Sequence, residues 1–429
     1  MKSVIIIGGG LAGISAAVNL ANKNFKIKLI ESSPFLGGRA KSYFDKKLSL
    51  WLDIGQHLLI TGYKETLDLF EKIDAKKNLI IQKKFCVKFR DKKLNQWKLT
   101  FSNSFEDLIN LLIFKNLKFR DKINFLNFLQ KIKNYQEEKF ENISVLDLLK
   151  SARQSEYIIE NFWRLFVEST MNSPIEKASA RVLIFILKKM FFENLNNACL
   201  IIPEKSFYES FINPAEKFLF DKSVEILKNT SITRLKFQND KVLSAIDNRG
   251  EKHFADLFVL AVPYHTYLKL MKKKDTKLNF QSIINANLIF ENYDSDQKFY
   301  ALWGSPVHWI FFHKTHITLT RSSADELQDL SESKLREIFL SEFREFFPEF
   351  INKKLIYFKI IKEKRATFIS DISSIKNRIP IETEFSNLFI AGDFVDTGYP
   401  STIESAVKSG RMAAQKILEM DVYKLAGLD

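Results

Sequence analysis

The sequence has little cysteine, with only Cys86 and Cys199 among 429 residues. Their positions fit neither a metal-binding cluster nor a redox-active pair, so we predict no metal site, and a reducing cytoplasm is the expected setting. Long apolar runs are also lacking, because no uncharged stretch approaches the roughly eighteen residues that span a bilayer. Residues 1–3 lead straight into an apolar run, which leaves no room for a cleavable signal peptide.

Acidic residues are fewer than basic ones, 51 against 65, and the formal net charge is +14. Such proteins meet nucleic acid, anionic lipid, or neither. No nucleic-acid-binding module is recognisable, so nucleic acid is discounted as a partner, and compositional drift explains part of the lysine. An anionic membrane surface stays open as a partner. We expect a cytoplasmic protein, or one peripheral at the inner face of the membrane.

The first forty residues predict the cofactor class. Residues 4–7 form a β-branched run that ends in a glycine turn at 8–13; a small-residue helix (14–22), a second apolar run (27–30) and an acid follow. This order is typical of the βαβ unit that binds a dinucleotide. The helix N-terminus faces the phosphates, and the acid accepts the ribose hydroxyls but would repel the 2′-phosphate of NADP. The predicted cofactor-binding residues here are Gly8, Gly10, Leu11, Ala12, Gly13 and Glu31.

A second glycine turn distinguishes FAD from NAD. Residues 32–40 read Ser-Ser-Pro-Phe-Leu-Gly-Gly-Arg-Ala, directly after the acid. Its glycines permit positive φ, and Arg39 can pair with the pyrophosphate or close over the flavin. The alternative is an ordinary turn with a solvated arginine. The stretch resembles the corresponding turn of the amine oxidase and phytoene desaturase flavoproteins, so we predict FAD, with Ser32, Gly38 and Arg39 among the residues that bind it.

Two later segments complete the expected cofactor domain. Residues 224–227, a hairpin at 231–247 and a buried strand ending at Pro263 resemble the second part of FAD domains of the glutathione reductase type. The third part is a strand that ends in Gly392 and Asp393, followed by a helix at 403–419. Ser401 or Thr402 is the expected N-cap, and this helix N-terminus, including Ile403, can face the flavin. By resemblance, Asp393 binds a ribityl hydroxyl; the alternative is an ordinary strand and amphipathic helix.

The expected fold is therefore α/β, an amine oxidase-like arrangement in which a discontinuous Rossmann domain carries an inserted α+β substrate domain. We assign residues 1–62, 205–263 and 386–429 to the FAD-binding domain, and residues 63–204 and 264–385 to the substrate domain. By periodicity residues 63–204 are largely helical. The second insertion mixes strands at 286–290, 307–312 and 317–320 with a helix at 331–347.

Residues 52–63 read Leu-Asp-Ile-Gly-Gln-His-Leu-Leu-Ile-Thr-Gly-Tyr. This segment resembles the D-x-G-Q-H-L-L-x-x-x-Y segment of the squalene-associated FAD-dependent desaturase family, whose members are hydroxysqualene dehydroxylases. The resemblance places Gly55, Gln56 and His57 beside the cofactor. Matches recur in order across residues 4–418, at 161–164, 171–179, 202–216, 308–311, 363–368 and 391–402. Departures, such as His308 for a glutamine and Phe394 for a tryptophan, bear on the substrate pocket rather than on FAD binding.

The resemblance implies reductive removal of a hydroxyl group from an apolar isoprenoid, hydroxysqualene, with an unidentified electron donor. His57 and Asp396 are the catalytic candidates. The histidine would be a proton donor or a hydrogen-bonded positioning residue, and the aspartate would orient a hydroxyl or water, or cap its own turn. The alternatives are a carotenoid or apophytoene-type desaturase and a non-catalytic lipid-binding protein on the same scaffold.

Two apolar stretches bear on the substrate. Residues 108–133 combine Leu, Ile and Phe with lysines and an arginine, as in a basic amphipathic surface helix pair suited to an anionic bilayer. Ordinary substrate-domain helices with solvated lysines explain them equally well. Residues 182–187, with Phe191 and Phe192, would suit the wall of a hydrocarbon tunnel or an ordinary core.

Overall fold

The first predicted strand, β1 (Lys2–Ile7), lies at the centre of a five-stranded parallel sheet in the computed structural model, which describes residues 1–101, 117–274 and 278–425. The strands follow the order β10 (Glu225–Leu227), β2 (Phe25–Ile30), β1, β14 (Leu257–Leu260) and β20 (Leu388–Ile390). All four pairings are parallel. Because such a sheet is covered on both faces, β14, β20 and most of β1 are apolar runs rather than alternating ones, whereas β2 carries two lysines. Three distant segments thus build one sheet, as predicted.

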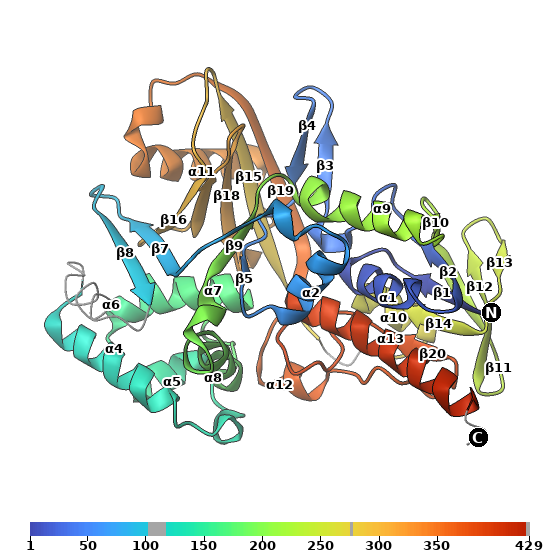
Figure 1. Ribbon diagram of the computed structural model, residues 1–429. Helices are drawn as coiled ribbons and strands as arrows, with labels where there is room; N and C mark the ends of the chain where they lie inside the picture. The colour runs from blue at the N-terminus through green and yellow to red at the C-terminus, as the bar shows by residue number, and fades with distance from the viewer. Residues whose placement is uncertain (102–116, 275–277, 426–429) are drawn as a thin grey trace.

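Helix α1 (Leu11–Ala21) and the C-terminal α13 (Ile403–Leu425) pack against each other beside this sheet (Figure 1). Ser15 Oγ donates to the Val407 carbonyl at 2.7 Å. A Cβ on Gly410 would lie 2.0 Å from the Ala12 carbonyl oxygen, so only glycine permits this approach. Helix α1 starts at Leu11 rather than Ile14, because the extended Gly10 is already its N-cap.

Three further helices, α2 (Lys64–Lys72), α9 (Asn213–Asp221) and α10 (Tyr264–Met271), bury side chains in the same core. The predicted hairpin is present as β11 (Ile232–Gln238) and β12 (Lys241–Asp247), joined by β13 (Lys252–His253). The domain limits assigned from the sequence stay a prediction, since α2 and α10 lie just outside them yet share this core.

The second large sheet is mixed and has seven strands. Their order is β19 (Leu355–Phe368), β15 (Phe280–Phe290), β18 (Ile317–Ser322), β17 (Trp309–Phe312), β16 (Lys298–Leu302), β7 (Phe85–Arg90) and β8 (Gln96–Phe101). Helix α11 (Glu332–Phe346) buries three phenylalanines against it and agrees with the helix predicted at 331–347, except that Ser331 is its N-cap.

The prediction that residues 63–204 are largely helical was incomplete. They also supply β7 and β8, together with β6 (Leu79–Ile81) and β9 (Leu200–Pro203), which pairs with β5 (Leu59–Ile60). Strand β7 pairs in parallel with β16, more than two hundred residues later, and such a partner leaves no local periodicity to read. Two short strands, β3 (Ser42–Asp45) and β4 (Leu50–Asp53), form a separate hairpin.

Below the mixed sheet in Figure 1 lies a helical group. It comprises α4 (Phe119–Ile132), α5 (Val145–Ser151), α6 (Glu156–Ile158), α7 (Arg164–Met171) and α8 (Ala180–Leu187), while α12 (Ile372–Lys376) lies near α13. The first half of the predicted basic helix pair lies outside the described residues. In the second half Phe119 and Ile123 are exposed, whereas Lys122 is buried, against the expectation of a solvated lysine. No helix in the described part of the chain is both long and apolar enough to cross a membrane.

Candidate active site

One cavity of about 1180 Å³ connects the two sheets. Single small-molecule sites usually measure roughly 300–1,000 Å³, so this space can hold a large ligand and a second molecule. At one end the lining comes from the glycine turns, the residue after β2 and the start of α13. At the other end it is largely apolar and aromatic. Lining residues at that end include Phe85, Val87, Phe89, Leu99, Phe101, Phe125, Leu126, Phe162, Phe166, Phe185, Ile186, Leu187, Phe191, Phe192, Trp309 and Phe311.

The first glycine turn forms a cradle for an anion. The Gly37 N–H donates to the Gly9 carbonyl at 2.8 Å and holds the two turns together. A Cβ on Gly10 would have only the Gly38 Cα near it, at 3.9 Å, so Gly10 leaves its backbone open where it lines the cavity. Helix α1 has no side-chain cap and no acid in its first turn. The free N–H groups of Leu11 and Ala12 are therefore available where both residues line the cavity. This arrangement fits the pyrophosphate of the predicted FAD.

Gly8 and Gly13 have different places in this turn. Gly8 lines the cavity, whereas Gly13 lies behind it. A Cβ on Gly13 would lie 1.9 Å from the Gly8 carbonyl oxygen, which is the close helix–strand packing predicted for it.

Glu31 lines the same end of the cavity, with Ser32 beside it. Its carboxylate oxygens accept hydrogen bonds from the Gly9 N–H at 2.7 Å and the Ser33 N–H at 2.8 Å. These bonds hold the carboxylate in one orientation, and its remaining lone pairs can accept ribose hydroxyls. The sequence prediction missed three lining residues nearby, Thr230, Ser231 and Ile232. The sequence could have indicated them, because they follow the predicted strand at 224–227, which pairs with β2.

Arg39 and Asp393, both predicted to bind the cofactor, contact each other. The guanidinium forms two hydrogen bonds with the carboxylate, at 2.5 and 3.1 Å, and a third with the Ala366 carbonyl at 2.9 Å. Ser401 also donates to Asp393. Burial would raise the pKa of Asp393, but the Arg39 guanidinium lowers it below the usual aspartate value. The partner of Arg39 in this structure is thus a carboxylate.

The segment after β20 reaches the cavity, and its contacts with FAD stay a prediction. Gly392, Asp393, Thr402 and Ile403 all line the cavity. Thr402 is the N-cap of α13, since its hydroxyl accepts from the Ser405 N–H at 3.3 Å.

A half-buried arginine that the sequence did not single out, Arg378, holds this segment. Its guanidinium donates to the Asp393 carbonyl at 3.0 Å and to the hydroxyls of Ser405 and Thr397, at 3.0 and 3.3 Å. No local motif signals these contacts, because they come from a different part of the chain.

Asp396 is not brought to the cavity. Its side chain is exposed, and its carboxylate accepts from the Gly398 N–H at 3.2 Å. It therefore caps its own turn, which was the alternative to a catalytic role.

The loop that carries Gly55, Gln56 and His57 lines the cavity. The mixed sheet holds its backbone, because the side-chain amide of Asn285 donates to the Ile54 carbonyl at 3.1 Å and that of Asn287 to the Asp53 carbonyl at 3.4 Å. Neither asparagine was predicted to act here.

Below this loop, the Asp53 carboxylate accepts from the Ser42 hydroxyl at 2.6 Å and the Phe207 N–H at 2.8 Å. The ring of Phe207 packs against His57, with centroids 4.9 Å apart. Burial lowers the pKa of His57 to about 4, so the imidazole is neutral at neutral pH. Its buried Nε2 atom has no hydrogen-bond partner within the described residues.

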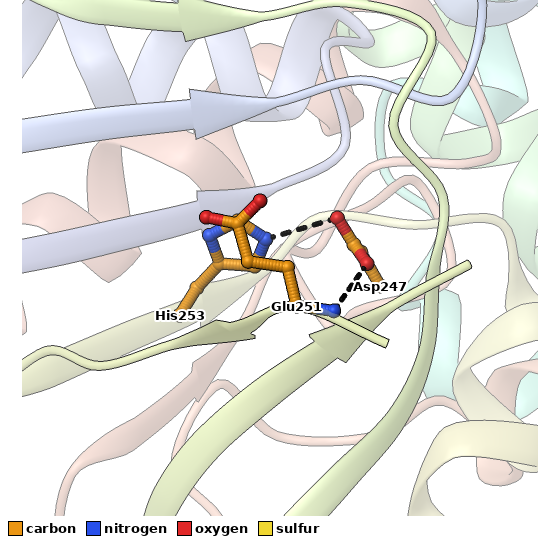
Figure 2. Close-up of side chains that lie close together, drawn as sticks. All are labelled: Asp247, Glu251 and His253. Atoms are coloured by element: carbon orange, nitrogen blue, oxygen red, sulfur yellow. Dashed lines mark hydrogen bonds and ion pairs between the residues drawn. The ribbon is translucent and has the colours of Figure 1, made fainter. Parts of the chain in front are cut away.

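A cluster outside the cavity contains three side chains of types that can bind a metal ion (Figure 2). Asp247, Glu251 and His253 lie together at the end of the β12–β13 hairpin, and their ligand atoms lie within 4.8 Å of one another. Asp247 also accepts from two backbone N–H groups of its turn, those of Arg249 and Glu251. These bonds close the turn, and none of the three residues lines the cavity.

Comparison with known proteins gives consistent matches over nearly the whole chain. The sequence model of the family described as flavin containing amine oxidoreductase matches residues 11–418. A hydroxysqualene dehydroxylase of Zymomonas mobilis subsp. mobilis is 27% identical, over 97% of this chain and 99% of its own. A 15-cis-phytoene desaturase of Capsicum annuum is 21% identical, over 97% and 78%. The structure of an oxidoreductase from Methanosarcina mazei has the same fold, with a TM-score of 0.73 at 16% identity, over 97% of this chain and 100% of that one.

Proposed function

This chain belongs to the flavin containing amine oxidoreductase family, and from that premise we propose that it reduces hydroxysqualene to squalene with FAD as its cofactor. The observation that carries the proposal is the continuous cavity, in which a dinucleotide cradle opens into an aromatic, apolar space. A full-length relative named as a hydroxysqualene dehydroxylase supports the choice of substrate.

The residues that would hold FAD form three groups. The N–H groups at the start of α1 would bind the pyrophosphate, and Glu31 the ribose. Arg39 and Asp393 would lie along the middle of the cofactor, and the N-terminus of α13 would face the flavin ring. FAD held there in its reduced form would supply the hydride that takes the place of the allylic hydroxyl group, and one proton would leave with that hydroxyl group as water.

The chain's own residues shape this reaction. The aromatic wall excludes water from the carbon that loses its hydroxyl group. His57 is neutral at neutral pH, because burial lowers its pKa to about 4. A neutral imidazole donates a hydrogen bond from one ring nitrogen and accepts at the other, so His57 would position the edge of the cofactor and would not act as an imidazolium acid. Asp396, which lies outside the cavity, has no part in this proposal.

The runner-up is a carotenoid desaturase, which would use the same site in the oxidative direction. The match to a phytoene desaturase favours it as the second candidate. A non-catalytic lipid-binding role is disfavoured, because Gly10 lines the cavity without a crowding neighbour and the start of α1 has no side-chain cap, as a dinucleotide site requires.

Anaerobic turnover tests the proposal. Purified protein that carries FAD is reduced chemically and incubated with hydroxysqualene, and the products are separated by gas chromatography. We expect squalene in proportion to the flavin present. No squalene under these conditions contradicts the proposed reaction, and desaturation of phytoene by the oxidised protein would select the runner-up. Protein that binds no flavin would contradict both.

A further inference from the structure

Two polar side chains meet in the largely aromatic wall of the cavity. The indole N–H of Trp309, on β17, donates to the hydroxyl oxygen of Ser169, on α7, at 2.7 Å. Both residues line the cavity, with Leu165, Phe166 and Phe311 among their neighbours in the wall. Neither residue was proposed from the sequence as a site residue.

This hydrogen bond fixes what the serine can offer to a ligand. An indole N–H is a donor only, whereas a serine hydroxyl has one O–H donor and two acceptor lone pairs. Trp309 therefore occupies one acceptor position of Ser169 and leaves its O–H proton to donate elsewhere. The described residues provide no acceptor for that proton, although Ser169 lines the cavity.

The next residue along the helix gives a useful contrast. Thr170 also lines the cavity, but its hydroxyl donates to the Phe166 carbonyl at 2.8 Å. Its proton is therefore already used within the helix. Ser169 and Thr170 thus present neighbouring hydroxyls, of which one can donate to a ligand and the other cannot without breaking a bond.

A buried charge cluster holds the Ser169–Trp309 pair in place. Glu168 and His308 directly precede the two residues, and their side chains meet at 3.3 Å. Arg321, on the neighbouring strand β18, lies 3.2 Å from the Glu168 carboxylate. Glu168 and His308 are each only 2% exposed. Because removing one member of a buried ion pair is strongly unfavourable, this cluster clamps α7 onto the sheet and presets the geometry of the pair.

We propose that the Ser169 hydroxyl, held by Trp309, is a subsite that binds the oxygen atom of an isoprenoid alcohol. The Ser169 hydroxyl is half-buried at the cavity, so a bound hydrocarbon would cover this donor without accepting from it, which is unfavourable, whereas a ligand oxygen would accept its proton. The subsite thus selects the alcohol substrate over the hydrocarbon product. The inference deepens the proposed function and rests on it for the identity of the ligand.

Binding to the protein with oxidised FAD, which cannot reduce the alcohol, tests this subsite. Hydroxysqualene and squalene are titrated separately in detergent, and binding is followed by the flavin absorbance. One neutral hydrogen bond predicts about a three- to tenfold preference for the alcohol. S169A should abolish the preference by weakening alcohol binding alone, whereas the matched control T170V should keep it. W309F, which retains a ring but no N–H, should reduce the preference, because the serine can then rotate.

The outcomes separate this inference from the reaction. If S169A keeps the wild-type preference, or if the wild type shows none, the subsite is overturned while squalene formation still supports the proposed function. If the wild type forms no squalene yet prefers the alcohol through Ser169, the reaction is overturned and the subsite stands. An equal loss of hydrocarbon binding in S169A would show a structural role and also contradict the subsite.

Discussion

Arg39 and Asp393, which lie 354 residues apart in the sequence, form a two-pronged ion pair at the cavity, with N–O distances of 2.5 and 3.1 Å. The pair joins the second glycine turn to the end of β20. Two-pronged guanidinium–carboxylate pairs are directional as well as strong, so this contact sets how the two segments face each other.

Replacing Asp393 with asparagine should weaken flavin binding. The substitution keeps the shape of the side chain but leaves the Arg39 charge without its partner. We expect the dissociation constant for FAD to rise about tenfold, less than for a fully buried charge pair because Arg39 is partly exposed. Titration of the stripped protein with FAD measures it. Lys416→Ala, which removes a surface ion pair with Glu382, is the control. An equal rise in the dissociation constant for this variant would contradict the role of Asp393 in FAD binding.

Gly410→Ala should separate α13 from α1. The new methyl group would lie 2.0 Å from the Ala12 carbonyl oxygen, and backbone on both sides prevents easy relief. Overpacking of this kind lowers the free energy of unfolding by about 1–3 kcal/mol. Denaturant unfolding measures the change, and Gln415→Ala, at an exposed position of the same helix, should have little effect. A G410A protein as stable as the wild type would show that the helices can move apart freely.

The FAD half of the fold was predictable because its signals are local. Strand, glycine turn, α1 and Glu31 follow one another within about thirty residues, and each has a residue type that its position demands. The roles of Asn285 and Asn287 were not predictable, because their amides bind carbonyl groups of a loop 231 and 234 residues earlier. Only the folded sheet brings these partners together.

Asp396 shows where a sequence motif fails to predict the position of a side chain. It lies within a segment that matches the family pattern, yet its carboxylate turns back to the Gly398 N–H instead of toward the cavity. A motif fixes the path of the backbone there, but not which side chain of the turn faces inward. For the same reason the apolar residues 182–187, with Phe191 and Phe192, could be assigned to either a tunnel or a core until the sheet that faces them was known.

Asp396→Ala should therefore leave catalysis nearly unchanged. The lost turn bond is exposed, and such bonds contribute about 0.5–1.5 kcal/mol to stability. We expect kcat/KM for hydroxysqualene to stay within about twofold of the wild type. A tenfold change would require the activation free energy to rise by about 1.4 kcal/mol. Steady-state squalene formation measures it. A loss of a hundredfold or more would restore Asp396 as a catalytic candidate.

His57 should make the protein less stable in mild acid. Its pKa is about 4 in the folded chain, against about 6.5 when unfolded. Between these values the unfolded state binds the extra proton, so the free energy of unfolding falls as the pH drops from about 6.5 towards 4 and is unaffected above that window. The effect at about pH 5 is on the order of 2 kcal/mol. H57Q should lack this part of the decline in urea unfolding at pH 7 and 5; identical slopes would contradict the burial of the imidazole.

Replacing Asn285 should loosen the loop that carries His57. Its amide N–H donates to the Ile54 carbonyl, and its oxygen accepts from Thr320 at 2.8 Å. Asn285→Leu keeps the branched shape and the number of side-chain heavy atoms but leaves both partners unpaired, and a buried unpaired group lowers stability by about 1–3 kcal/mol. The loop should then exchange its amide hydrogens faster, as seen by mass spectrometry of a peptide spanning residues 54–57. Thr320→Val removes only the bond to the asparagine oxygen and keeps the one to Ile54, so its loop should stay protected. Equal exchange in the two variants would mean that packing against Phe207, rather than the asparagine, holds the loop.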